Sequence, residues 1–216
     1  MTSHPLPTMR LKSHWFRPGA EKTPAQQASA MAFIVFRVAQ NMLKRMRGAQ
    51  FDIDAGTPYF AFLREVLVFL VALTDRLAHA RLDAAGRAEF TQALVCHIAR
   101  NLAENEHDLL GPPAFGAEPY EDSFIDLVNQ LSLHYAEFGA DPSLPVDGLD
   151  FQPDFGFVRY LGNRLEPTLP EKDRLWVLDQ VMAAEAPEAI AIVRRSMRDL
   201  HDAALRRPRR SSLSGE

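Results

Sequence analysis

The stretch PYFAFLREVLVFLVALTDRLAHA, residues 58–80, decides the fold of this 216-residue chain. Its apolar side chains cover well over half of a helical wheel, so a helix formed here has little surface to offer to water. The stretch is also far longer than a buried strand, which typically has about five or six residues. The sequence therefore predicts a central apolar helix over about 58–80, with Thr57 as its N-cap and Pro58 as its first helical residue.

Charged residues within this stretch argue against a membrane span, although its length would allow one. Arg64 and Glu65 would lie inside the hydrocarbon, where a charged residue near the helix centre costs roughly 2.5–3.5 kcal/mol. With Asp75, Arg76 and His79 they fall on one narrow side of the wheel. We therefore expect no membrane span, and we expect this side to face water or a polar neighbour.

Capping signals place one helix before the central stretch. Thr23-Pro24-Ala25-Gln26 is typical of a capping box with proline at the first helical position. The apolar residues that follow form two adjacent stripes, and Gly48 is expected to end the helix in a left-handed conformation.

The third helix is predicted from Ala84 to about Leu110. Asp83 is its expected N-cap, and Gly111-Pro112-Pro113 is its expected terminator. We expect its buried side to consist of Phe90, Leu94, Val95, Ile98, Leu102 and Leu109.

Prolines and glycines divide the rest of the chain into further helices. One opens at Pro119 and ends at Gly139, a shorter one runs from Pro153 to about Leu165, and another opens at Pro170. Pro187 either kinks this last helix or begins a new one. Because no strand candidate is present and no repeat occurs at a fixed period, the fold class is all-α: an irregular bundle of six or seven helices around the central one.

The charge distribution suggests one domain with two basic ends. Residues 1–22 carry four basic residues against one acid, and so do residues 206–216; the net charge of -4 for the whole chain therefore leaves -10 for the body. We predict a flexible basic N-terminal segment (1–22), a single all-helical domain (23–205) and a disordered basic C-terminal tail (206–216).

The amino-acid composition indicates the cellular location and the source of the protein. The single cysteine, Cys96, excludes an intramolecular disulfide, and the first 22 residues lack the apolar core of a secretory signal. We expect a cytoplasmic location. Arginine outnumbers lysine and alanine is abundant, which is typical of proteins from GC-rich bacterial genomes.

A polar side of the third helix is the most chemically interesting surface in the sequence. Glu104-Asn105-Glu106-His107 has the Glu-x-x-His spacing used in carboxylate-bridged di-iron bundles, but no second copy of the motif is present. His97, Glu104 and His107 are the candidate ligands for a mononuclear divalent metal. The other interpretation is a solvated, salt-bridged helix face.

Few other patterns point to chemistry. The sequence has no Gly-x-Ser-x-Gly elbow, P-loop, dinucleotide fingerprint or zinc-type cysteine pair. Direct nucleic-acid binding is not expected, because the body is acidic and no basic recognition helix is evident.

We therefore predict a non-enzymatic helical protein that binds a protein partner or self-associates, for example as a homodimer through apolar faces of the first helix, and that needs no cofactor. The alternative is a metal- or small-ligand-binding bundle, or a metalloenzyme, that uses the polar face of the third helix.

Overall fold

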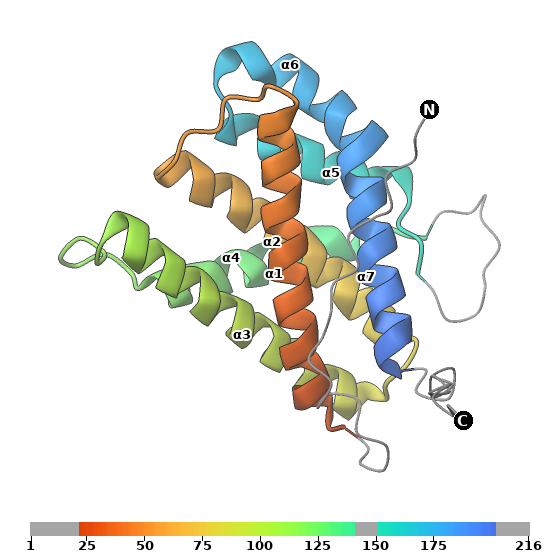
Figure 1. Cartoon of the computed structure of the whole chain (residues 1–216). Helices are drawn as coiled ribbons and strands as arrows, with labels where there is room; N and C mark the ends of the chain where they lie inside the picture. Colours follow the sequence, from red (N-terminus) through yellow and green to blue (C-terminus); the bar gives the residue numbers. More distant parts are fainter. Residues whose placement is uncertain (1–21, 141–150, 202–216) are drawn as a thin grey trace, which may run out of the picture.

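The apolar stretch forms the helix α2 (Thr57–His79), and α2 lies at the centre of the protein. The computed structural model describes residues 22–140 and 151–201 (Figure 1). The other α-helices are α1 (Pro24–Gly48), α3 (Ala84–Leu110), α4 (Tyr120–Ala136), α5 (Phe155–Leu165), α6 (Glu171–Gln180) and α7 (Ala186–His201). The described part of the chain contains no strand, so the predicted all-α bundle is confirmed.

Five helices pack against α2, namely α1, α3, α4, α5 and α7. Within α2 only Thr57, Pro58 and His79 are exposed, as expected for a helix with an almost continuous apolar surface. Among the described helices, α2 is the one that is long and apolar enough to cross a membrane. However, 67% of its most apolar window is buried inside the protein, and the core helix of a water-soluble bundle has the same properties.

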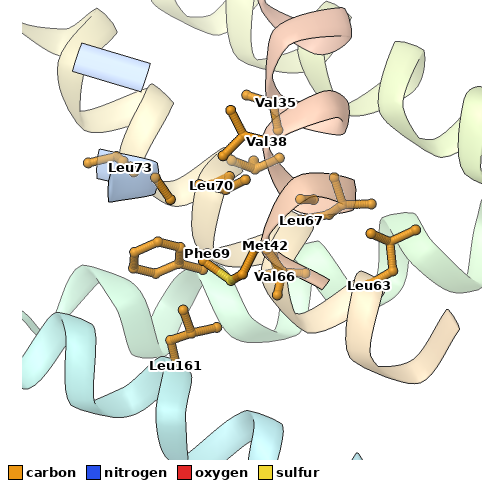
Figure 2. Close-up of a cluster of buried hydrophobic side chains, with 14 of the residues drawn as sticks. Val35, Val38, Met42, Leu63, Val66, Leu67, Phe69, Leu70, Leu73 and Leu161 are labelled. Atoms are coloured by element: carbon orange, nitrogen blue, oxygen red, sulfur yellow. The ribbon is translucent and has the colours of Figure 1, made fainter. Parts of the chain in front are cut away.

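The core forms where α1 crosses α2 (Figure 2). Val35, Val38 and Met42 of α1 meet Leu63, Leu67 and Leu70 of α2, and Leu161 of α5 approaches from below in this view. Both apolar stripes of α1 are buried inside the protein, because α1 contacts α3 and α7 as well as α2. Its one exposed large hydrophobic residue is Phe33. The helix face suggested above for a homodimer is therefore mostly occupied within the chain itself.

Two of the predicted helix starts are confirmed in detail. Thr23 and Gln26 form the reciprocal bonds of a capping box, and the Asp83 carboxylate accepts a hydrogen bond from the Gly86 amide at 2.7 Å. The prediction for Thr57 is wrong. Gly56 occupies the N-cap of α2 with φ of 108°, and no side chain caps this end, because Thr57 is already helical.

The predicted left-handed stop at Gly48 is also wrong. Gly48 is the last helical residue, and Gln50 takes the left-handed conformation with φ of 71°. The Phe51 amide bonds to the Met46 carbonyl and the Gln50 amide to the Arg47 carbonyl, which is the Schellman pattern. The hydrogen bonding of the last turn therefore places the left-handed residue two positions after the glycine.

A wide turn joins α6 to α7 without a break in the helical path. Val181–Glu185 forms one π-helical turn, in which the Ala186 amide bonds to the Val181 carbonyl. Pro187 follows directly as the second residue of α7. Proline removes a donor and crowds the preceding turn, and a wider turn relieves this crowding, so the helix continues past the proline.

Several predictions concern residues outside the described part of the chain. They include the flexible N-terminal segment, the C-terminal tail and most of the proline-containing loop at 140–152. The ends of that loop are described: Ala140 and Pro153 form an isolated antiparallel bridge, and the Asp154 amide bonds to the Gly139 carbonyl at 3.1 Å.

Candidate functional site

The charged residues of α2 are used mainly to join helices. Arg64 makes a two-pronged ion pair with Glu106 of α3, with both N···O distances at 2.9 Å. Arg64 also donates to the Ser123 hydroxyl and the Tyr120 carbonyl of α4. Glu106 is only 2% exposed, so the pair is buried. Arg64 thereby connects three helices through one guanidinium group.

The neighbouring Glu65 joins α2 to α5. Its carboxylate accepts from Arg164 Nε at 3.0 Å and Nη2 at 2.5 Å. Tyr135 and Tyr160 stack edge to face beside this pair, with ring centroids 5.0 Å apart. Burial raises the pKa of Tyr135 well above its ordinary value, and the charge of Glu65 raises it further.

The buried Tyr135 predicts a loss of stability in alkaline solution. The folded protein holds the phenol proton more tightly than the unfolded chain does. The stabilisation is therefore complete below about pH 10 and is lost as the pH rises towards the higher folded pKa. We expect the free energy of unfolding, measured in urea between pH 9 and 11, to fall with pH less steeply for Tyr135→Phe than for the wild type. The two slopes should differ by up to about 1.4 kcal/mol per pH unit, the value for one proton. Equal slopes for the two proteins would contradict this assignment.

The remaining charges on α2 are also engaged. Asp75 accepts from Arg87 and, at 2.6 Å, from the Thr91 hydroxyl of α3. Arg76 donates to the carbonyls of Ala136, the last residue of α4, and Phe138, both at 3.0 Å. These bonds satisfy carbonyl groups that a helix end leaves without partners. The polar side of α2 thus faces polar neighbours at Arg64, Glu65, Asp75 and Arg76, and water at His79.

The predicted metal ligands lie on the outer side of α3. His97 is half-buried, and Glu104 and His107 are exposed. The His107 ring packs edge to face on Tyr120 at 5.1 Å. Over residues 22–140 and 151–201, no group of three or more histidine, cysteine, aspartate or glutamate side chains is placed to hold a metal ion. The geometry of the described residues therefore gives the metal site no support.

A group of exposed apolar side chains lies at the connection between α3 and α4, which we call the hairpin tip and define as Leu109, Leu110 and Phe115. Leu109 is 56% exposed, Leu110 38% and Phe115 fully exposed. In Figure 1 this connection projects from the bundle, far from α6 and α7. Leaving these side chains in water forgoes a burial free energy of about 1.5–3 kcal/mol each. Such a group marks a candidate contact surface.

Local contacts hold the tip in shape. The Tyr120 hydroxyl donates to the Gly111 carbonyl at 3.2 Å across the base of the connection. Gly111 and Gly116 have φ values of 82° and 80°, a conformation that suits glycine because it has no Cβ atom. The connection is therefore a defined structure that presents Phe115 outward.

Negative charge surrounds the hairpin tip. Residues 101–140 contain eight acidic residues and no lysine or arginine. One of these acids, Glu106, is paired with Arg64 from α2. Partial desolvation, and then the charges of Asp126 and Asp122, raise the pKa of the exposed Glu118 carboxyl. The hairpin formed by α3 and α4 thus combines an apolar tip with acidic flanks.

The sequence analysis placed Leu109 of α3 wrongly and assigned no side to Glu106. Leu109 was assigned to the buried side and is exposed, because α3 extends beyond the helices that cover it. Glu106 is buried, whereas Glu104 and His107 are not. A signal for Glu106 was present: it follows Ile98 and Leu102 at four-residue spacing and so continues the buried stripe.

Comparisons with known proteins give no relative for this chain. No protein-family model, no curated protein and no solved structure matches it.

Proposed function

We propose that this protein is a non-enzymatic interaction module that binds a protein partner or a second copy of itself through the hairpin tip. The observation that carries the proposal is the exposure of Leu109, Leu110 and Phe115 at a connection that projects from the bundle (Figure 1). Large hydrophobic side chains exposed as a group are typical of contact surfaces between proteins.

The charged side chains support the same function. Arg64, Glu65 and Asp75 form ion pairs between helices, so these charges have a role as contacts within the fold. The exposed polar side of α3 then serves as the rim of a contact surface, and interface rims are commonly polar.

Substituting the tip tests this function. The double variant Leu109→Ser with Phe115→Ser should keep the melting temperature of the wild type, since both side chains are exposed. It should lose at least about tenfold in binding, because apolar side chains at the centre of a contact contribute much of its free energy. Immobilised protein, incubated with extract of the native host and read by quantitative mass spectrometry, measures capture; analytical ultracentrifugation measures self-association.

The matched control is Leu133→Ser on α4, because Leu133 is 75% exposed but lies more than three turns along α4 from the connection. It should bind as the wild type does. If the double tip variant captures the same proteins and self-associates as the wild type does, the hairpin tip is not the contact surface.

A further inference from the structure

We propose that the hairpin tip binds the basic, aromatic segment around Trp15 and Phe16 of a second copy of this chain. The inference rests on the proposed function of the tip, and it adds the identity of the segment that binds there. It predicts a dimer in which the N-terminal segment of each chain binds the hairpin tip of the other.

Charge complementarity is the first argument for this occupant. Residues 8–20 contain Arg10, Lys12 and Arg17 and no acid. The part of the hairpin within residues 101–140 has the opposite composition, with exposed carboxylates at Glu104, Asp108, Glu118, Asp122 and Asp126 and no lysine or arginine. Opposite charges on two surfaces speed their encounter and disfavour other partners.

Apolar complementarity is the second argument. Trp15 and Phe16 are adjacent aromatic residues, and Leu11 and Met9 precede them. Tryptophan and phenylalanine bury about 150–250 Å² each at contacts, and tryptophan is common at the centres of interfaces. The tip offers the matching surface in Leu109, Leu110 and Phe115.

The C-terminal residues match the tip less well. They are basic through Arg206, Arg207, Arg209 and Arg210, but beyond His201 they contain no aromatic residue. An anionic lipid surface is also a poor match, since the carboxylates that flank the tip would be repelled by its phosphates.

The short stretch of chain between Trp15 and α1 favours binding of the segment to a second copy. Pro24 lies beside Gly86, where a Cβ atom would be 3.6 Å from the proline ring, so α1 begins close to the start of α3. Leu109 is 23 residues farther along α3, which is about 35 Å at 1.5 Å per residue. Trp15 precedes Thr23 by eight residues, which span at most about 28 Å when fully extended. Trp15 could therefore reach the tip of its own chain only at full extension, so a relaxed segment reaches the tip of a second copy more readily.

A reciprocal exchange follows from this geometry. Two copies related by a two-fold axis can each place the segment on the partner's tip, which gives two equal contacts and a closed dimer. Because the contacts are partly electrostatic, the dimer should weaken as the salt concentration rises.

Complementation between two full-length variants tests the proposal. The first, Trp15→Ala with Phe16→Ala, has an intact tip and an impaired segment. The second, Leu109→Ser with Phe115→Ser, has an intact segment and an impaired tip. In sedimentation-velocity titrations the wild type should dimerise, and each variant should do so at least about tenfold more weakly. An equimolar mixture should recover heterodimer, because one intact contact forms between the two variants.

Circular dichroism spectra and melting temperatures should be equal for all proteins, which excludes unfolding as the cause. The control replaces Arg206, Arg207, Arg209 and Arg210 with glutamine and should dimerise as the wild type does. A monomeric wild type, a mixture that stays monomeric, or a first variant that dimerises normally would each overturn the proposal. So would loss of the dimer in the arginine control, which would assign the contact to the C-terminal residues.

Failure of this inference can be separated from failure of the proposed function. If the first variant behaves as the wild type does but the second loses captured proteins, the tip binds another partner and the proposed function stands. If the second variant loses neither its dimer nor its captured proteins, both proposals fall.

Discussion

Replacing Phe69 with alanine should reduce the free energy of unfolding by about 4 kcal/mol, the largest effect expected for a single residue of this core. Phe69 is fully buried on α2, and its ring contacts those of Tyr135 on α4 and Phe157 on α5, with centroids 6.2 and 5.4 Å away. The substitution removes a large apolar group where three helices meet, and the close-packed surroundings relax only partly into the space. Urea unfolding followed by circular dichroism at 222 nm measures the change.

A phenylalanine at the surface provides the matched control for Phe69→Ala. Phe155 begins α5 and is 67% exposed, so Phe155→Ala should change the free energy of unfolding by no more than about 0.5 kcal/mol. A loss below about 1 kcal/mol for Phe69→Ala would contradict the central position of α2.

Replacing Arg64 with methionine should cost about 3 kcal/mol, because the substitution leaves the Glu106 carboxylate buried without its partner. Three helices lose a connection at once, since Arg64 also donates to Ser123 and Tyr120. Unfolding in urea at pH 7 measures the loss.

The double variant Arg64→Met with Glu106→Leu separates charge from packing. With both charges replaced by apolar side chains of similar size, most of the lost stability should return. The surface control is Arg37→Met, because Arg37 is exposed and its side chain bonds to Gln40 within α1. Additive losses in the double variant would show that the two residues do not act as a pair.

The sequence alone was sufficient to predict most of the fold. The length and apolar surface of the central stretch predict α2 to within one residue at each end, and Asp83 and Leu110 predict the bounds of α3. These features are local, since a helix start depends on residues within one turn. Gly48 shows the limit of that reasoning: a glycine permits a left-handed stop, but the backbone bonds of the whole last turn decide where it occurs.

The candidate site was less accessible to sequence reasoning. Periodicity shows that Leu109 continues an apolar stripe, but it does not show that α3 extends beyond its neighbours at that point. In the same way, Glu106 fits a polar motif and a buried stripe equally well, and the choice depends on Arg64, which lies 42 positions earlier. Exposure and pairing are properties of the assembled helices, so a single helix does not reveal them.

The wide turn between α6 and α7 has a consequence for the periodicity of the sequence. Val177, Val181 and Glu185 are buried at four-residue spacing, and α7 continues this spacing at Ala189, Val193 and Met197, with Ala186 also buried. In an uninterrupted α-helix of 3.6 residues per turn, a strict four-residue series drifts by about 40° around the helix axis at each step. The π-helical turn contains more residues per turn than an α-helix, so it offsets part of this drift. The four-residue series therefore stays on the inner side from α6 to α7, although Pro187 lies within it.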